Sequence, residues 1–265
     1  MTPDVARISD LMREVAAEEI LPRFRRLSAE DVREKRPGNL VTTADLASEA
    51  RLINGLAAIA PDATVVAEEM AEADLVGVLG RLSGEAPVWV IDPVDGTANF
   101  AKGKEDFAVI VAYVERGRTR VGLIYEPARD RLTVAEEGGG AWQDGTRLAV
   151  AGRIPLTEMT GSLGYKLRYD PNVTTQVGSL LTLKSAGCEH VALSSGRFHF
   201  SLYRRSWPWD HAAGVLIHRE AGGYSAALDG APYSPSGAPE QGLLLAPDRD
   251  SWQRLHDLVL PALRR

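Results

Sequence analysis

The chain has 265 residues, which suits one large domain or two closely packed halves. Hydrophobic residues make up 45% of it and charged residues 25%, as in an ordinary globular protein. The formal net charge of −6 argues against a nucleic-acid-binding surface, because binding to a phosphate backbone requires a basic face.

The single cysteine and the N-terminal residues indicate the compartment. Cys188 has no second cysteine with which to form an intrachain disulfide, and this fits a reducing environment. Residues 1–4 include an acid where a secretory signal needs bases, and no long apolar run follows them. We therefore expect a cytoplasmic protein with no membrane partner.

The N-terminal third combines two amphipathic helices with a short strand. Thr2 is expected to cap a helix that has Pro3 in its first turn and an apolar face extending to Ile20. A polar stretch, broken by Pro37-Gly38, separates this helix from the next. The second expected helix is Leu46–Ile59, and the expected strand is Ala63–Ala67.

The segment Trp89–Phe100 is the most informative part of the chain. It is typical of a buried strand that ends in two carboxylates and then turns into a helix. Asp92 and Asp95 flank a turn whose φ angle is partly fixed by Pro93, so both side chains can point to one place beyond the strand. The amides of Gly96-Thr97 follow, and free amides at a helix start bind anions. The pattern predicts a site for a metal-bound phosphate.

The next segment favours antiparallel strands. Apolar runs with a period of two cover 107–114, 119–124 and 132–135. The glycines at 138–140 and the Asp144-Gly145 pair are typical of tight hairpin turns. We interpret the three glycines as a hairpin and not as a phosphate-binding loop, because no strand and helix surround them.

Beyond residue 150, strands and helices alternate. The expected helices are 172–183, 210–221 and 251–263, and the expected strands are 161–165 and 242–246. The mixture predicts an α/β (α+β) fold in one unit. We expect an N-terminal α+β half, residues 1–150, and a C-terminal α/β half, residues 151–265, that share one active site.

Three further acids are candidates to join Asp92 and Asp95. They are Glu68, just after an expected strand, Asp45, at the end of a polar loop, and Asp210, at the start of an apolar helix. Like charges about 4 Å apart repel by roughly 4 kcal/mol at an effective dielectric constant of 20, so a cluster of them implies a bound cation. Oxygen ligands favour Mg²⁺ or Mn²⁺ over zinc. An aspartate at a helix start is also an ordinary N-cap, and this alternative stays open for Asp210.

The motifs resemble those of the inositol monophosphatase family, part of a wider Mg²⁺-dependent, Li⁺-inhibited phosphatase superfamily. The resemblance rests on five segments, in the expected order: 35–45, Ala67-Glu68-Glu69, Asp92-Pro93-Val94-Asp95-Gly96-Thr97, Trp209-Asp210-His211-Ala212-Ala213-Gly214 and Glu220-Ala221-Gly222-Gly223. It implies a layered αβαβα sandwich, a homodimer, and hydrolysis of a small phosphorylated metabolite by a metal-activated water.

The resemblance also implies the metal ligands. Glu68, Asp92 and the carbonyl of Val94 would bind one Mg²⁺, and Asp92, Asp95 and Asp210 a second. Two or three ions per site are expected, with Mn²⁺ as a substitute and Li⁺ as an inhibitor. Asp95 and Asp210 would also face the substrate.

The remaining implied roles concern the water and the phosphate. Thr97, polarised through Asp45 and aided by Glu68, would orient the water and help to deprotonate it, with Asp92 also counted as catalytic. The amides of Gly96 and Thr97 would bind the phosphate.

Several departures from the family pattern bear on the substrate. Ala67 replaces a glycine, Glu189 replaces a small residue, and 191–209 lack the acid that inositol-specific members use to bind sugar hydroxyls. Arg204 and Arg205 suit a second anionic group, although two solvated arginines would have the same sequence. The alternatives are a 3′-phosphoadenosine 5′-phosphate or histidinol-phosphate phosphatase, and a non-catalytic, metal-binding regulatory protein of the same fold.

Overall fold

A sheet of seven strands forms the centre of the N-terminal half of the molecule. The computed structural model describes residues 2–164 and 167–263. In the large sheet β3 and β4 are parallel and the other neighbouring strands are antiparallel. Its strands in order are β3 (Thr64–Ala67), β4 (Val88–Asp95), β5 (Ala108–Glu115), β6 (Arg118–Glu126), β7 (Arg131–Glu136), β8 (Gly140–Gln143) and β9 (Thr146–Arg147). The hairpins predicted at 138–140 and at Asp144-Gly145 are confirmed.

The C-terminal half contains a smaller sheet of five strands. Strand β10 runs parallel to its two neighbours, whereas β14 runs antiparallel to both of its own. Its strands in spatial order are β11 (Ser179–Leu180), β10 (Thr160–Ser162), β12 (Phe200–Tyr203), β14 (Leu243–Ala246) and β13 (Tyr224–Ala226). The predicted strands at 161–165 and 242–246 correspond to β10 and β14, and Tyr165 lies outside the described residues.

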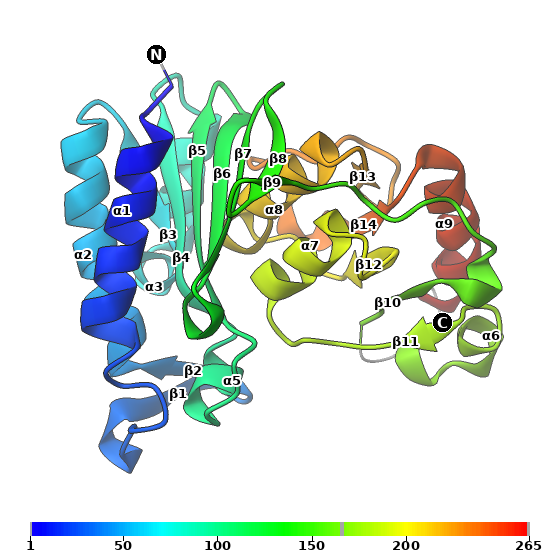
Figure 1. Ribbon diagram of the computed structural model, residues 1–265, viewed down its shortest axis with the longest axis horizontal. Helices are drawn as coiled ribbons and strands as arrows, with labels where there is room; N and C mark the ends of the chain where they lie inside the picture. Colours follow the sequence, from blue (N-terminus) through cyan, green and yellow to red (C-terminus); the bar gives the residue numbers. More distant parts are fainter. Residues whose placement is uncertain (1, 165–166, 264–265) are drawn as a thin grey trace.

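Helices cover both sheets, so that five layers follow one another across the molecule (Figure 1). The helices α1 (Val5–Val15) and α2 (Thr43–Ile59) pack on the outer face of the large sheet. Between the sheets lie α7 (Ala186–Ser194) and α8 (Pro208–Glu220), and α9 (Arg249–Leu263) covers the small sheet. This arrangement confirms the predicted αβαβα sandwich. None of the helices in the described part of the chain is long and apolar enough to span a bilayer.

Short elements connect these layers. Helix α1 continues into a π-helical turn, Ala16–Ile20, and a hairpin follows before α2. The polar stretch around Pro37-Gly38 forms the turn of this hairpin, in which Gly38 has a φ angle of 81°. The short strands and helices that connect the layers include β1 (Val32–Arg36), β2 (Asn39–Thr42), α3 (Glu68–Ala71), α4 (Leu75–Gly80), α5 (Thr97–Ala101) and α6 (Pro171–Thr174).

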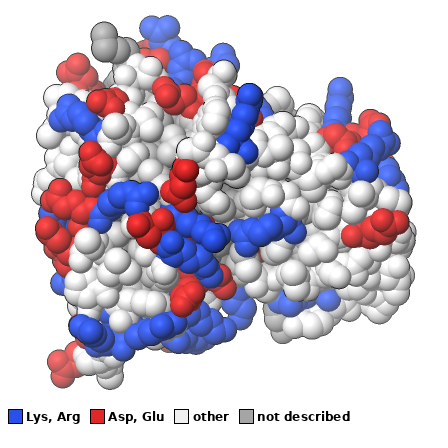
Figure 2. Space-filling model, in the orientation of Figure 1, with Lys and Arg blue, Asp and Glu red and all other residues white. Residues whose placement is uncertain are grey.

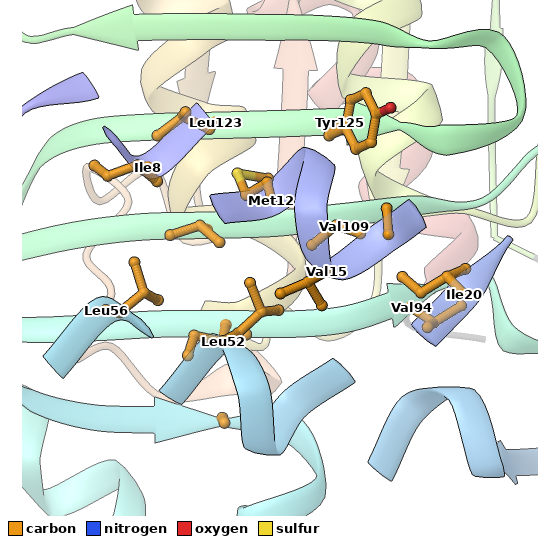
Figure 3. Packing of buried hydrophobic residues seen from close by; sticks show 14 of the residues in the cluster. Ile8, Met12, Val15, Ile20, Leu52, Leu56, Val94, Val109, Leu123 and Tyr125 are labelled. Atoms are coloured by element: carbon orange, nitrogen blue, oxygen red, sulfur yellow. The ribbon is translucent and has the colours of Figure 1, made fainter. Parts of the chain in front are cut away.

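The packing under α1 and α2 fixes the strand that carries the two aspartates (Figure 3). Met12 of α1 and Leu52 of α2 meet the buried strand residues Val109 and Leu123. Val94, which lies between Asp92 and Asp95 in the sequence, is fully buried in the same core. Since cores are close-packed, the backbone at the end of β4 has little freedom to move.

Two sequence predictions were wrong. The cap of α1 is Asp4, whose carboxylate accepts a hydrogen bond from the Ala6 amide at 2.9 Å, and not Thr2. Residues 172–183 do not form a helix: α6 ends at Thr174, and the chain then joins the small sheet as β11. A Cβ at Gly178 would lie 2.8 Å from the Glu158 carbonyl carbon, so close backbone packing replaces the expected helix.

Candidate active site

The end of β4 brings two carboxylates to the edge of the large sheet. Its pairing with β5 is irregular between Asp92 and Asp95, as at a β-bulge, which changes the direction of the following side chains. Gly96 then takes a left-handed conformation, with φ = 86°, and α5 begins at Thr97. Because β3 runs parallel to β4, Glu68, which is the first residue after β3, reaches the same edge.

Three of the predicted acids form one group. One carboxylate oxygen each of Asp92, Asp95 and Asp210 lies within 4.8 Å of the others. Asp210 lies in the first turn of α8, where Trp207 is the N-cap, so it does not cap the helix. Because β4 and α8 are in separate layers, only the tertiary fold brings these acids together.

The electrostatics of this group fit a bound cation. Burial, together with the neighbouring carboxylates, raises the pKa values of Asp92 and Asp210 well above the usual aspartate range. A divalent cation among these oxygens would relieve the same repulsion. The donor set, three carboxylates, matches the ligands that Mg²⁺ and Mn²⁺ prefer.

Asp95 also binds the start of helix α7. Its carboxylate accepts hydrogen bonds from the Ser185 hydroxyl, from the Ala186 amide at 3.0 Å and from the Gly187 amide at 2.8 Å. Burial raises the pKa of Asp95, and these bonds oppose the rise. Neither α7 nor Ser185 was predicted from the sequence. The Ser185 hydroxyl accepts a hydrogen bond from the Cys188 amide as the N-cap of α7, and serine is a recognisable residue at a helix start.

The predicted pairing of Thr97 with Asp45 is present. The Thr97 hydroxyl lies 3.1 Å from Oδ1 of Asp45 and 3.0 Å from the carbonyl oxygen of Val94, so its one proton has two acceptors. The other oxygen of Asp45 accepts from the amide and hydroxyl of Thr42 in a capping box at the start of α2. Burial raises the pKa of Asp45 to about 6.

Glu68 lies beside the three-carboxylate group but is not part of it. Its carboxylate pairs with Lys35 of β1, whose ammonium lies 3.3 Å from Glu68 and 2.9 Å from Glu69. Burial raises the pKa of Glu68 to about 7, and the Lys35 charge opposes the rise. Lys35 belongs to the segment 35–45 that contributes to the family resemblance, but its ion pair with Glu68 was not predicted.

A cleft of about 530 Å³ opens beside the three-carboxylate group. Asp95 and Asp210 lie on its wall, as do the two predicted arginines, Arg204 and Arg205. Further lining residues that the sequence analysis did not assign to the site are Arg168, Lys184, Ser185 and His211. A second cleft, of about 240 Å³, reaches Glu68 and shares Arg205 and Asp210 with the first. The two clefts therefore place Glu68, Asp95, Asp210 and the two arginines around neighbouring openings.

Comparison with known proteins places the chain in a family. The profile of the inositol monophosphatase family matches residues 4–265, nearly the whole chain. The chain belongs to the inositol monophosphatase family. This membership confirms the resemblance read from the motifs, and with it the expectation of a phosphoric monoester hydrolase.

Two relatives and one solved structure illustrate the range of inositol monophosphatase family members. A Thermotoga maritima protein named fructose-1,6-bisphosphatase/inositol-1-monophosphatase is 32% identical over 196 residues, which cover 72% of this chain and 73% of that one. The Nus factor SuhB of Escherichia coli is 33% identical over 207 residues, 74% of each chain. The structure of a Thermotoga maritima IMPase superposes with a TM-score of 0.80 at 25% identity, over 97% of this chain and 96% of that one. The shared fold agrees with the predicted fold class.

Proposed function

We propose that the protein is a Mg²⁺-dependent phosphomonoesterase that hydrolyses a small sugar, polyol or related phosphate. The observation that carries this proposal is the group of carboxylates from Asp92 and Asp95, which are buried, and Asp210, which is half-buried, within 4.8 Å of one another beside an open cleft. Buried like charges this close are costly unless a cation or a proton compensates them.

The proposed ligands follow the family resemblance. Glu68, Asp92 and the Val94 carbonyl are assigned to one ion, and Asp92, Asp95 and Asp210 to a second, with Li⁺ as an expected inhibitor. Divalent cations at such a site polarise the phosphate, activate water and neutralise the leaving alkoxide. The Lys35 ammonium pairs with Oε1 of Glu68 at 3.3 Å, and the carboxylate has a second oxygen with which to bind an ion.

The chain's own groups would position the water and the phosphate. When the Thr97 hydroxyl donates a hydrogen bond to Asp45, its oxygen can accept a hydrogen bond from a water in front of it. If the water then gives its proton to Thr97, the hydroxyl proton of Thr97 would pass to Asp45. With a pKa of about 6, Asp45 is mostly ionised at neutral pH and can hold the hydroxyl in this orientation. The amides of Gly96 and Thr97 lie at the start of α5, where amides have no acceptor within the helix, and would bind phosphate oxygens.

A regulatory role without turnover is the second candidate. It is favoured by one observation, that a relative with 33% identity carries the name Nus factor SuhB. The same carboxylates would then bind a cation to stabilise the fold. The predicted homodimer and the cytoplasmic location are compatible with both candidates and stay predictions.

Phosphate release from four compounds tests the proposal. They are inositol 1-phosphate, fructose 1,6-bisphosphate, 3′-phosphoadenosine 5′-phosphate and histidinol phosphate, each assayed with Mg²⁺, with EDTA and with added Li⁺. Turnover that requires Mg²⁺ and falls with Li⁺ supports the enzyme. If no compound releases phosphate while Mg²⁺ still raises the melting temperature, the regulatory alternative gains instead.

A further inference from the structure

The cleft next to the three-carboxylate group has two chemically different parts. Asp95 and Asp210 lie on its wall at the candidate metal site. Four cationic side chains lie elsewhere on the wall: Arg168, Lys184, Arg204 and Arg205. The face of the molecule in Figure 2 shows acidic and basic side chains interspersed over the larger half, and the net charge is −6. We call these four cationic side chains the basic wall of the cleft. The basic wall is a local feature of an acidic protein.

These cations are not neutralised within the described part of the chain. No ion pair joins Arg168, Lys184, Arg204 or Arg205 to a described acid, whereas Arg51, Arg120 and Arg129 each form ion pairs on other surfaces. The guanidinium of Arg205 lies 5.9 Å from the ring centroid of Trp207, which also lines the cleft. The basic wall therefore keeps its charge for an anion that enters the cleft.

A buried glutamate holds the segments that carry these cations. Glu189 of α7 accepts hydrogen bonds from Thr182 at 3.1 Å and from the Leu183 amide at 3.0 Å, immediately before Lys184. Its other oxygen accepts from the Tyr203 hydroxyl at 3.0 Å, immediately before Arg204. The Ser162 hydroxyl on β10 donates to the first oxygen at 3.1 Å. Glu189 thus fixes three strands or loops of the cleft wall, and its oxygens are already engaged by protein donors.

The segment with Lys184 is also held from the other side. The side-chain amide of Asn99, in α5, donates to the Leu183 carbonyl at 2.7 Å. Lys184 itself has a left-handed backbone, with φ = 56°, which is rare for a residue other than glycine. Ser185 follows it and donates to Asp95. The position of Lys184 is therefore set by the same contacts that orient the candidate metal ligand.

We propose that this cleft binds substrates with a second anionic group, and that Lys184 and Arg204, with Arg168, bind that group while the scissile phosphate lies at the carboxylates. The proposal rests on the proposed phosphomonoesterase function and deepens it by naming the substrate class: a sugar bisphosphate or a phosphorylated nucleotide. The protein's own donors already engage both oxygens of Glu189. The cleft wall therefore provides cations that can bind a phosphate rather than acceptors that can bind sugar hydroxyls.

Two pairs of compounds that differ only in the second phosphate test the proposal. They are fructose 1,6-bisphosphate with fructose 1-phosphate, and 3′-phosphoadenosine 5′-phosphate with adenosine 3′-phosphate. We would measure kcat and KM for wild type, for Lys184→Gln, for Arg204→Gln and for the double variant. Arg254→Gln, an exposed cation on α9 outside the cleft, is the matched control. Calorimetry in EDTA adds dissociation constants without turnover.

We expect wild type to favour the bisphosphate of at least one pair by about tenfold or more in kcat/KM, because charge-assisted hydrogen bonds to the second phosphate are strong. The double variant should lower that preference by about tenfold, mainly through KM, while Arg254→Gln leaves it within about twofold. The responding pair identifies a sugar or a nucleotide substrate. Turnover of the monophosphates with no preference in wild type would overturn the inference and leave the proposed function intact. If nothing is hydrolysed, the proposed function fails, and equal dissociation constants within both pairs would overturn the inference as well.

Discussion

Gly96 connects the last carboxylate of β4 to the first residue of α5, and two independent restraints act on it. Its φ angle of 86° lies in the region that favours glycine. A Cβ there would also lie 2.9 Å from the Asp106 carbonyl oxygen and 3.0 Å from Cβ of Ser185. Because Ser185 binds Asp95, crowding at this glycine displaces the site directly.

Replacing Gly96 by alanine should therefore lower both stability and activity. We expect a loss of about 1–2 kcal/mol from the backbone conformation and about 1–3 kcal/mol from crowding, with a large fall in kcat. Chemical denaturation and phosphate release measure the two effects. Gly145→Ala is the control, since Gly145 has a φ angle of 81° and no heavy atom within 4 Å of the added Cβ. Equal losses in the two variants would show that crowding at the site is unimportant.

At the scale of elements, α7 and α8 pack against each other through a histidine and a glycine. The His190 ring of α7 lies over Gly214 of α8, and its Nε2 lies 3.0 Å from Nδ1 of His211. Nε2 of His211 lies 3.2 Å from the Arg205 carbonyl oxygen, so it can donate to it. This places the helix that carries Asp210 against the helix that binds Asp95.

Alanine at Gly214 should separate these helices. A Cβ there would lie 2.1 Å from Cγ of His190, which is far too close. Alanine gains up to about 1 kcal/mol of helix propensity, but we expect a net loss of about 1–3 kcal/mol from overpacking, together with reduced activity. Thermal denaturation measures it. Gly152→Ala, at an exposed position with open space, should change stability by less than about 0.5 kcal/mol, and a similarly small effect at Gly214 would contradict the packing account.

The sequence predicted those elements whose pattern is local. The apolar runs at 107–114 and 119–124 gave β5 and β6, and the glycine-rich turns gave the hairpins that follow. It missed α7 because nearly the whole helix is buried between the two sheets, which leaves no polar face to mark a helical period. It missed β12 and β13 because strands of three or four residues have too few positions for a pattern.

The candidate site likewise combines local features with contacts that depend on the tertiary fold. The acids at the end of β4 follow from their spacing, whereas the group they form with Asp210 depends on how two layers pack. The ion pair between Lys35 and Glu68 and the bonds from Ser185 to Asp95 join residues far apart in the sequence. No short motif encodes such contacts. The resemblance to the family supplied the candidate ligands, but it did not predict what holds them.

At the scale of the whole molecule, buried histidines make stability depend on pH. Burial lowers the pKa of His218 to about 3, against about 6.5 in an unfolded chain. Below pH 6.5 the unfolded chain therefore binds a proton that the folded chain does not. Stability should fall as the pH decreases from 6.5 towards 3, by up to about 1.4 kcal/mol per pH unit from this residue.

The variant His218→Gln isolates this contribution. It has the same carboxylates as wild type, so the difference between their stability curves reports the histidine alone. We expect a shallower decline with acid for the variant, measured by urea denaturation from pH 7 to pH 4, whatever its stability at pH 7. Parallel curves would show that His218 is protonated equally in both states.

The most direct test of the central claim is phosphate release by Asp92→Asn. Asp92 belongs to the three-carboxylate group and is assigned to both proposed ions, so its neutral replacement should lower Mg²⁺-dependent turnover by at least about a hundredfold. The melting temperature without Mg²⁺ should stay within a few degrees of wild type, because asparagine removes a buried charge and keeps the shape. Asp62→Asn, an exposed change outside the site, should retain full activity. Turnover by Asp92→Asn at the wild-type rate would contradict the assignment of the active site.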